Sequence, residues 1–103
     1  MIDHVAVNVS NIEDSVNWYL KNLNAKIEYV DETWAMLNIN GSKIALILKE
    51  EHPPHIAIKV SPDELKSAAK NSKIKTHRDG SSYVYLKDLD SNHIEYICYD
   101  FDE

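Results

Sequence analysis

The chain has 103 residues and a formal net charge of −6, with 11 basic residues against 17 acidic ones. This length suits one domain with a modest hydrophobic core. The acidic balance and the lack of a basic stripe argue against nucleic acid or an anionic membrane as a partner, and no apolar run is long enough for a membrane span.

The chain opens with a predicted strand followed by a predicted helix. Residues 2–9 alternate in character and are rich in valine, which is typical of a strand. A helix is expected over residues 11–22, with Ser10-Asn11 offering the N-cap and Glu13 at capping-box spacing from Ser10. Asn24 can adopt the left-handed conformation that ends a helix.

Three further strands complete the first half of the chain. We expect them at about 25–30, 33–39 and 43–49. Asn40-Gly41 is a strong signal for a type I′ hairpin turn. The segment from Glu50 to Pro54 is the one plausible linker, because its two prolines prevent strand pairing. The first half is therefore predicted to be β-α-β-β-β.

The second half repeats this order of elements. We expect a strand at 55–60, a helix at 62–70, a weak strand at 73–77 and strong strands at 82–87 and 93–99. Ser61 is the expected N-cap of the helix, with Pro62 at its first position and Glu64 as the capping-box acid. The acidic tail, Asp100 to Glu103, is expected to fray.

An internal repeat accounts for this duplication. The segment that begins at His4 aligns with the segment that begins at His55, and the aligned pairs that are identical are His4/His55, Ala6/Ala57, Val9/Val60, Ser10/Ser61 and Glu13/Glu64. A repeat of half the chain indicates two copies of one supersecondary unit. Pairing of the two copies about a pseudo-twofold axis would bring the two imidazoles together, and convergent imidazoles suggest a metal site.

Two tandem βαβββ units with a histidine in the first strand of each resemble the vicinal oxygen chelate (glyoxalase, bleomycin resistance and extradiol dioxygenase) superfamily. The most specific match is the segment 88–95, which resembles the superfamily's Asp-Pro-Asp-Gly-Asn-x-hydrophobic-Glu signature, with Leu89 and Ser91 replacing proline and glycine. The resemblance implies an α+β fold, in which modules 2–49 and 54–99 form a cupped mixed β-sheet with helices outside. The whole chain, 1–103, would then be a single domain joined by the linker 50–54.

The resemblance also implies a set of metal ligands. In this superfamily the first and the last strand of each module each offer one position to the metal. These positions correspond here to His4 and Ala45 in the first module and to His55 and Glu95 in the second. The internal repeat independently aligns Ala45 with Glu95. Because alanine cannot bind a metal, the implied set is two histidines and one glutamate, which suits Zn, Mn, Fe, Ni or Co and leaves positions open for a substrate.

Glu95 and its neighbours also have ordinary interpretations. Glu95 interrupts an apolar strand, and an ionised carboxylate there needs a partner, either the metal or a lysine or histidine from a neighbouring strand. His93, on the same face of the strand, is a candidate catalytic proton-transfer group, or equally a solvated residue at the strand end. Tyr85, together with Tyr83, is a candidate for an aromatic, hydrogen-bonding wall of the pocket, or for ordinary sheet packing.

Two other histidines receive weaker hypotheses. His52 lies beside the two prolines of the linker and could be a fourth ligand, although a linker histidine is usually a surface residue. His77 lies in the weakest predicted strand, and we expect it to have no role. The lone Cys98 cannot form an internal disulfide, and the strand pattern begins at residue 2 without a leader segment, so we expect a soluble, cytoplasmic protein.

These patterns favour a small divalent-metal-dependent enzyme that acts on an oxygen-chelating substrate by Lewis-acid catalysis. Ala45 argues against glyoxalase I or methylmalonyl-CoA epimerase activity in the familiar form, because both need a carboxylate or amide there. The reaction class (lyase, isomerase, transferase or dioxygenase) therefore stays open. The alternatives are a metal-free small-molecule binding protein of the bleomycin-resistance type, or an interaction subunit. The resemblance also implies a homodimer, since members of the superfamily commonly dimerise.

Overall fold

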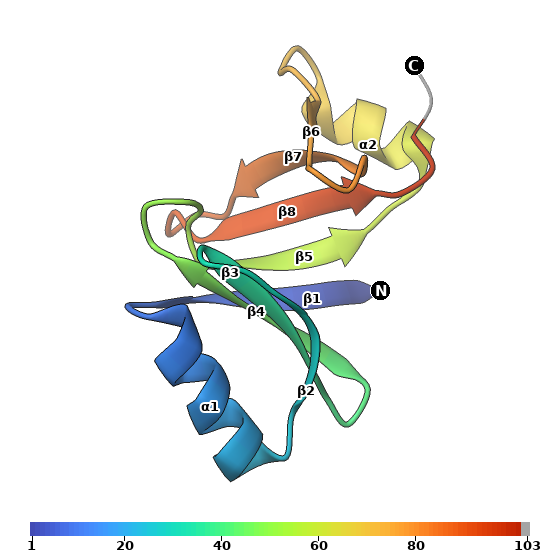
Figure 1. Cartoon of the computed structure of the whole chain (residues 1–103). Coiled ribbons are helices and arrows are strands. Elements are labelled where there is room, and N and C mark those ends of the chain that lie inside the picture. The colour runs from blue at the N-terminus through green and yellow to red at the C-terminus, as the bar shows by residue number, and fades with distance from the viewer. Residues whose placement is uncertain (102–103) are drawn as a thin grey trace. The chain divides into compact units, whose positions relative to one another are not determined.

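The computed structural model describes residues 1–101 (Figure 1). The strands are β1 (Ile2–Val9), β2 (Lys26–Val30), β3 (Trp34–Ile39), β4 (Ser42–Leu48), β5 (His55–Lys59), β6 (Lys75–Thr76), β7 (Ser82–Lys87) and β8 (His93–Cys98), and the helices are α1 (Ile12–Leu23) and α2 (Pro62–Ala69). The described residues form two compact units. The first unit is His4–His55, and the second unit joins Met1–Asp3 to the chain from Ile56 onward.

The first unit has the strand order β2-β3-β4-β1, with one helix against it (Figure 1). β1 pairs with β4 in parallel, while β3 is antiparallel to both β2 and β4. A parallel pair needs a long crossover connection, and α1 lies within it and contacts β3 and β4. The apolar face of α1 buries Ile12 and Val16 against the strand residues Leu37 and Leu46.

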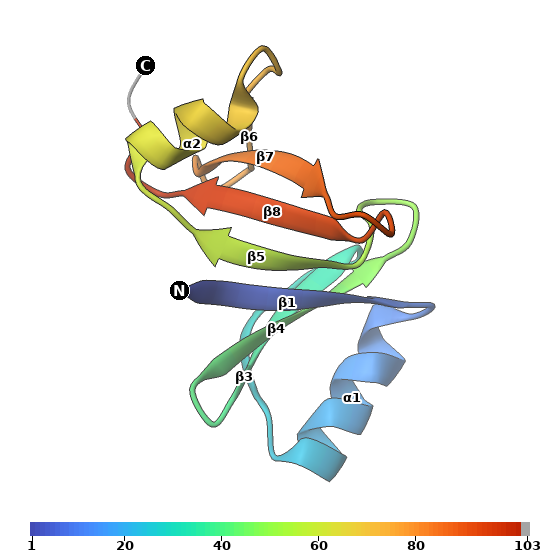
Figure 2. The same cartoon turned by 180° about the vertical axis from the view of Figure 1, so that it is seen from behind.

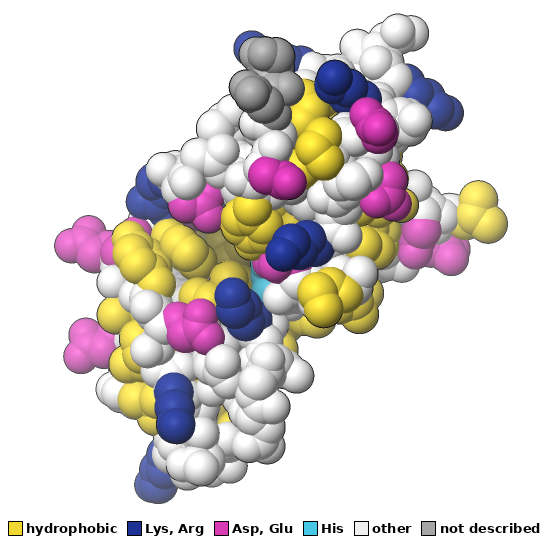
Figure 3. Space-filling view, turned by 90° about the vertical axis from the view of Figure 1, so that its right-hand side faces the viewer, with side chains coloured by type: hydrophobic (Ala, Val, Ile, Leu, Met, Phe, Trp, Pro, Cys, Tyr) yellow, Lys and Arg dark blue, Asp and Glu magenta, His cyan; other side chains and the backbone are white. Residues whose placement is uncertain are grey.

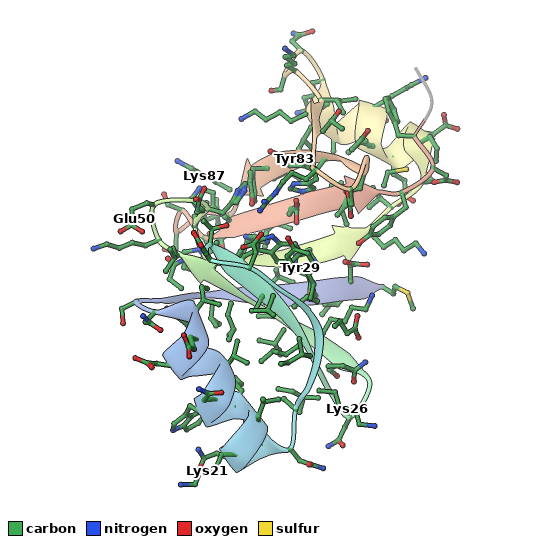
Figure 4. The ribbon with its side chains drawn as sticks, viewed as in Figure 1. Lys21, Lys26, Tyr29, Glu50, Tyr83 and Lys87 are labelled. Carbon is green, nitrogen blue, oxygen red and sulfur yellow. The ribbon has the colours of Figure 1, made fainter. Side chains whose placement is uncertain are left out.

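The ends of α1 follow from side chains that satisfy free backbone groups. The side chain of Asn11, not of Ser10, caps the first turn by accepting a hydrogen bond from Asp14 N–H at 2.8 Å. The expected capping box of Ser10 and Glu13 is therefore wrong, because the cap falls one residue later. Asn24 ends the helix with φ of 52°, as predicted. Lys21, labelled in Figure 4, lies in the last turn, where its positive charge interacts favourably with the negative end of the helix dipole.

The second unit has the corresponding strand order β5-β8-β7-β6, and α2 lies over β7 and β8 (Figure 2). β7 is antiparallel to both β8 and β6. The predicted capping box of α2 is confirmed, because Ser61 accepts from Glu64 N–H while the Glu64 side chain accepts from Ser61 N–H. Leu65 of the helix packs with Val84 and Cys98 in the core beneath it.

Each unit buries a second, separate apolar cluster. Its strand residues alternate along the chain with those that pack against the helix. In the first unit this cluster contains Ala6, Ala45 and Ile47. In the second unit it contains Ala57, Tyr83 and Ile97. Successive side chains of a strand point to opposite faces of the sheet, so these clusters lie on the face that the helix does not cover. His4 shares the parity of Ala6, and Glu95 that of Ile97, which assigns the candidate ligands to this face.

All five residues of β2 are exposed, although the strand is paired with β3. Its exposed apolar side chains are Ile27, Tyr29 and Val30. Glu28 lies between them and accepts a hydrogen bond from Asn38 Nδ2 at 2.9 Å. The pairing with β3 shifts register between Ile27 and Tyr29, which marks an irregularity in this strand.

The expected α+β fold of two βαβββ modules is confirmed, with both parallel and antiparallel strand pairs. The prediction of a single domain over 1–103 stays a prediction, and residues 102–103 of the acidic tail lie outside the described residues. No helix in residues 1–101 is both long and apolar enough to cross a membrane. Figure 3 shows basic and acidic side chains interspersed on the face drawn there.

The turn before β8 forces a serine into a conformation that favours glycine. Ser91 has φ of 67°, and its N–H donates to Asp88 O at 3.2 Å. Left-handed backbone costs an ordinary residue about 1–2 kcal/mol, whereas the added flexibility of a glycine costs about 0.5–1 kcal/mol. The difference between these two costs predicts the effect of restoring glycine at this position.

We therefore expect Ser91→Gly to raise the free energy of unfolding by about 0.5–1 kcal/mol, as measured by urea denaturation. Ser91→Ala is the matched control, because it retains the Cβ atom and should bring no gain in stability. A Ser91→Gly variant no more stable than Ser91→Ala would show that the left-handed turn is not strained.

Candidate functional site

Two buried histidines face each other within the first unit. His4 lies on β1 and His55 at the start of β5, and their exposed fractions are 8% and 7%. Their Nε2 atoms lie 3.4 Å apart. The ring centroids are separated by 5.5 Å and the ring planes are inclined by 74°. The repeat predicted that these imidazoles converge, and the structure confirms it.

The other ring nitrogen of His55 determines which form of the ring is present. Nδ1 of His55 lies 2.8 Å from the carbonyl oxygen of Pro53. A carbonyl can only accept a hydrogen bond, so Nδ1 carries the proton and donates it. In the neutral ring Nε2 is then an unprotonated base whose lone pair is directed at His4. Histidines that bind metals commonly hold their second nitrogen in this way.

The distance between the two Nε2 atoms decides between a hydrogen bond and a pair of ligands. At 3.4 Å it exceeds the usual donor–acceptor range of about 2.7–3.2 Å for an N–H donor. Two nitrogens that each bind one tetrahedral ion at about 2.0–2.1 Å lie about 3.3–3.4 Å apart. The buried pair therefore fits two neighbouring ligands of a metal better than it fits a direct hydrogen bond.

Asn8 holds the linker close to this pair, and sequence analysis missed its role. Its Nδ2 atom donates to His52 O at 3.0 Å and to Ile47 O at 3.2 Å. These contacts connect the linker to β4 and β1, and the linker carries the Pro53 carbonyl that orients His55. The backbone carbonyl of His52 makes one of these contacts, and a role of its side chain as a fourth ligand stays a prediction. An asparagine on a valine-rich strand, at the same strand parity as His4 and Ala6, was the available signal.

The third predicted ligand, Glu95, lies on β8 in the second unit. It is 1% exposed, and in the antiparallel pairing with β7 it lies directly opposite Tyr85. His93 is paired with Lys87, two positions along the same strands, so it shares a face with Glu95. The ring of His93 meets that of Tyr85 edge-on, with centroids 5.8 Å apart. Glu95, Tyr85 and His93 are therefore brought together on one face.

His77 is the hydrogen-bond partner of Glu95, which corrects the expectation that His77 has no role. Its Nε2 atom is bonded to Oε2 of Glu95. Its ring stacks on Tyr83, with centroids 3.7 Å apart and planes inclined by 7°. This contact is the ordinary interpretation of Glu95, in which a nearby histidine satisfies the carboxylate. The burial of Glu95 therefore gives no argument for a metal, and that argument rests on His4 and His55.

The aromatic residues of β7 form a continuous row with the two histidines of the second unit. Tyr83, labelled in Figure 4, meets Tyr85 edge-on at 5.6 Å between centroids. Burial, and then the nearby negative charge of Glu95, raise the pKa of Tyr83. The same causes raise the pKa of Tyr85 far above its ordinary value, with Tyr83 adding to the effect. Both hydroxyls therefore keep their protons near neutral pH and can act as hydrogen-bond donors.

Known proteins resemble this chain over nearly all of its length. A model of the Glyoxalase/Bleomycin resistance protein/Dioxygenase superfamily matches residues 1–103. Methylmalonyl-CoA epimerase from Mycobacterium tuberculosis is similar with a TM-score of 0.73 and 16% identity, covering 94% of this chain and 86% of that one. No curated protein matches the sequence.

Two further solved structures share the fold. One is a methylmalonyl-CoA epimerase from Streptomyces coelicolor in complex with 2-nitronate-propionyl-CoA, with a TM-score of 0.73, 13% identity and coverage of 100% of this chain and 97% of that one. The other is a glyoxalase/bleomycin resistance protein/dioxygenase superfamily member from Vibrio splendidus 12B01. It has a TM-score of 0.69 and 12% identity, and the match covers 95% of this chain and 98% of that one. At these identities, the likeness to solved structures shows the fold alone.

The raised pKa of Tyr85 predicts how stability changes in alkali. Above pH 10.0, the ordinary tyrosine value, the unfolded chain releases the Tyr85 proton while the folded chain keeps it. Stability that is fully present below that pH is therefore lost as the pH rises. We expect Tyr85→Phe to lose less stability than the wild type when urea denaturation is repeated above pH 10.0. Equal losses in the two proteins would contradict the burial of this hydroxyl.

Proposed function

Because the chain belongs to the glyoxalase/bleomycin resistance protein/dioxygenase superfamily, we propose that it is a divalent-metal-dependent enzyme for a small substrate that chelates through adjacent oxygens. The single observation that carries the proposal is the pair of buried Nε2 atoms of His4 and His55, 3.4 Å apart. This separation matches that of two neighbouring nitrogen ligands of one tetrahedral ion. A divalent cation could therefore bind both nitrogens.

The proposed metal ligands are His4, His55 and Glu95. Two neutral imidazoles and one carboxylate suit Zn, Mn, Fe, Ni or Co. Three protein ligands leave coordination positions for two substrate oxygens. Bound there, the ion would act as a Lewis acid that polarises a carbonyl and stabilises developing negative charge. Ala45 replaces the fourth ligand of the repeat, so the site has one carboxylate where a four-ligand site would have two.

Tyr85 and His93 are the proposed groups for handling the substrate and its protons. Tyr85 lies opposite Glu95 and keeps its proton, so it can donate a hydrogen bond to a substrate oxygen but cannot act as a base near neutral pH. His93 shares a face with Glu95 and carries an imidazole, a side chain that can both accept and donate a proton, which suits a proton-transfer group. Their edge-on ring contact supports a joint action of the two.

The second candidate function is binding of a small molecule without a metal, as in the bleomycin-resistance type. The contact between His77 and Glu95 favours it, because the carboxylate then has a partner in the protein itself. We further propose that two copies associate, as the superfamily resemblance implies. A reducing, cytoplasmic location fits the single cysteine, Cys98, which is fully buried as a thiol.

Metal analysis of the purified chain tests the proposed function. We expect about one divalent ion per chain after reconstitution with Zn²⁺ or Co²⁺, and we expect His55→Ala and Glu95→Gln to lose most of that metal, because each removes one of three ligands. Glu13→Gln is the matched control for Glu95→Gln, since it changes an exposed carboxylate on α1, outside the proposed set, and should retain the ion.

The opposite results would favour the alternative. A wild-type protein that takes up none of Mn²⁺, Fe²⁺, Co²⁺, Ni²⁺ or Zn²⁺ would overturn the metal-dependent enzyme and leave small-molecule binding as the better account. Uptake that survives both His55→Ala and Glu95→Gln would place the ion elsewhere in the chain. Binding without metal would then be sought as a rise in Tm when candidate ligands are added.

A further inference from the structure

The contact between His77 and Glu95 joins two side chains of the second unit that are distant in sequence. Nε2 of His77 is bonded to Oε2 of Glu95. A carboxylate oxygen facing an imidazole nitrogen accepts, so Nε2 of His77 carries the proton and donates it. The side chain of Glu95 is 1% exposed and that of His77 is 25% exposed. In such a buried position water competes little for the bond, and the bond can fix the orientation of the carboxylate.

His77 is itself held from two directions. Its N–H donates to Ser81 O at 2.8 Å, and its carbonyl accepts from Gly80 N–H at 3.0 Å, so the turn fixes its backbone. The turn is closed further by Asp79, whose Oδ1 accepts from both the N–H and the hydroxyl of Ser81. The stacking of the imidazole on Tyr83 fixes the plane of the ring. The backbone and the ring plane of His77 are therefore both fixed, with its Nε2–H group directed at Glu95.

From these contacts we infer that His77 is a positioning residue, which orients the Glu95 carboxylate so that its other oxygen, Oε1, is presented to the metal. The inference rests on the proposed function, which assigns Glu95 to the ion. A glutamate side chain loses conformational freedom when it binds a metal, and a glutamate already held by one oxygen loses less. Removal of such a supporting contact typically lowers metal affinity by about 10–100-fold.

A purely structural role of His77 makes a different prediction from a positioning role. If the contact only supplies a hydrogen bond to a buried carboxylate, its loss lowers the stability of the metal-free protein. The metal affinity of the molecules that fold then stays unchanged. If the contact orients Glu95, its loss weakens metal binding, and a different side chain with a donor at the same reach restores it. Measurement of affinity on folded variants separates the two roles.

The test is titration of the full-length protein with Co²⁺, followed by calorimetry and by the visible absorption of the bound ion. His77→Met removes the donor, and His77→Gln has similar length but keeps an amide N–H. We expect His77→Met to weaken Co²⁺ binding by about 10–100-fold and to change the absorption bands, and His77→Gln to recover most of the affinity. Glu13→Gln, at an exposed position on α1, is the control substitution and should bind Co²⁺ as the wild type does.

A second variant keeps the test decisive if His77→Met does not fold. His77→Phe retains a ring to stack on Tyr83 but has no donor, so it is expected to bind as weakly as His77→Met. Wild-type affinity in either donor-less variant, or equal weakness of His77→Gln and the donor-less variants, would overturn the positioning role while the metal site stands. A wild-type protein that binds no Co²⁺ would overturn the proposed function and this inference together.

Discussion

The strands β1, β4 and β8 each present two faces with different surroundings. Successive side chains point to opposite sides, so one set packs against a helix, as Leu37 and Leu46 do beneath α1, while the alternate set carries the polar candidates such as His4 and Glu95. A shift of the pairing by one residue would exchange the two sets and place charged groups in the helix-covered cores. The register of Ala6 with Ala45 and of Tyr85 with Glu95 therefore determines both the packing and the chemistry.

The two copies of the repeat differ in polarity at one pair of equivalent positions. Ala45 lies beside Ala6 in a small apolar cluster and needs no partner. Glu95 occupies the equivalent position, and its burial is sustained by the donor of His77 and by the neighbouring tyrosine rings. A buried carboxylate without such support would cost several kcal/mol. The turn that carries His77 is therefore as much a part of the candidate site as the strand that carries Glu95.

Local patterns were enough to predict most of the elements, and the internal repeat predicted that His4 and His55 converge. Period-two valine runs, the Asn40-Gly41 turn and the Ser61 capping box depend on neighbouring residues, and the structure agrees with them. Ser10 and Asn11 were both candidates for the N-cap of α1 because both are good caps, and the geometry of the chain entry selects Asn11, which excludes the capping box of Ser10 and Glu13. His77 was missed because its partner, Glu95, is 18 residues away, and no periodicity links a turn residue to a strand residue.

The exposure of β2 bears on how the protein behaves in concentrated solution. A strand at the end of the order β2-β3-β4-β1 presents backbone groups that a strand of another molecule can pair with, and Ile27, Tyr29 and Val30 are exposed along it. The charged Lys26 and Glu28 alternate with these apolar residues, and the register shift disturbs the regular spacing that a docking strand would need. The same five residues thus combine a tendency toward fibrous aggregation with the features that restrain it.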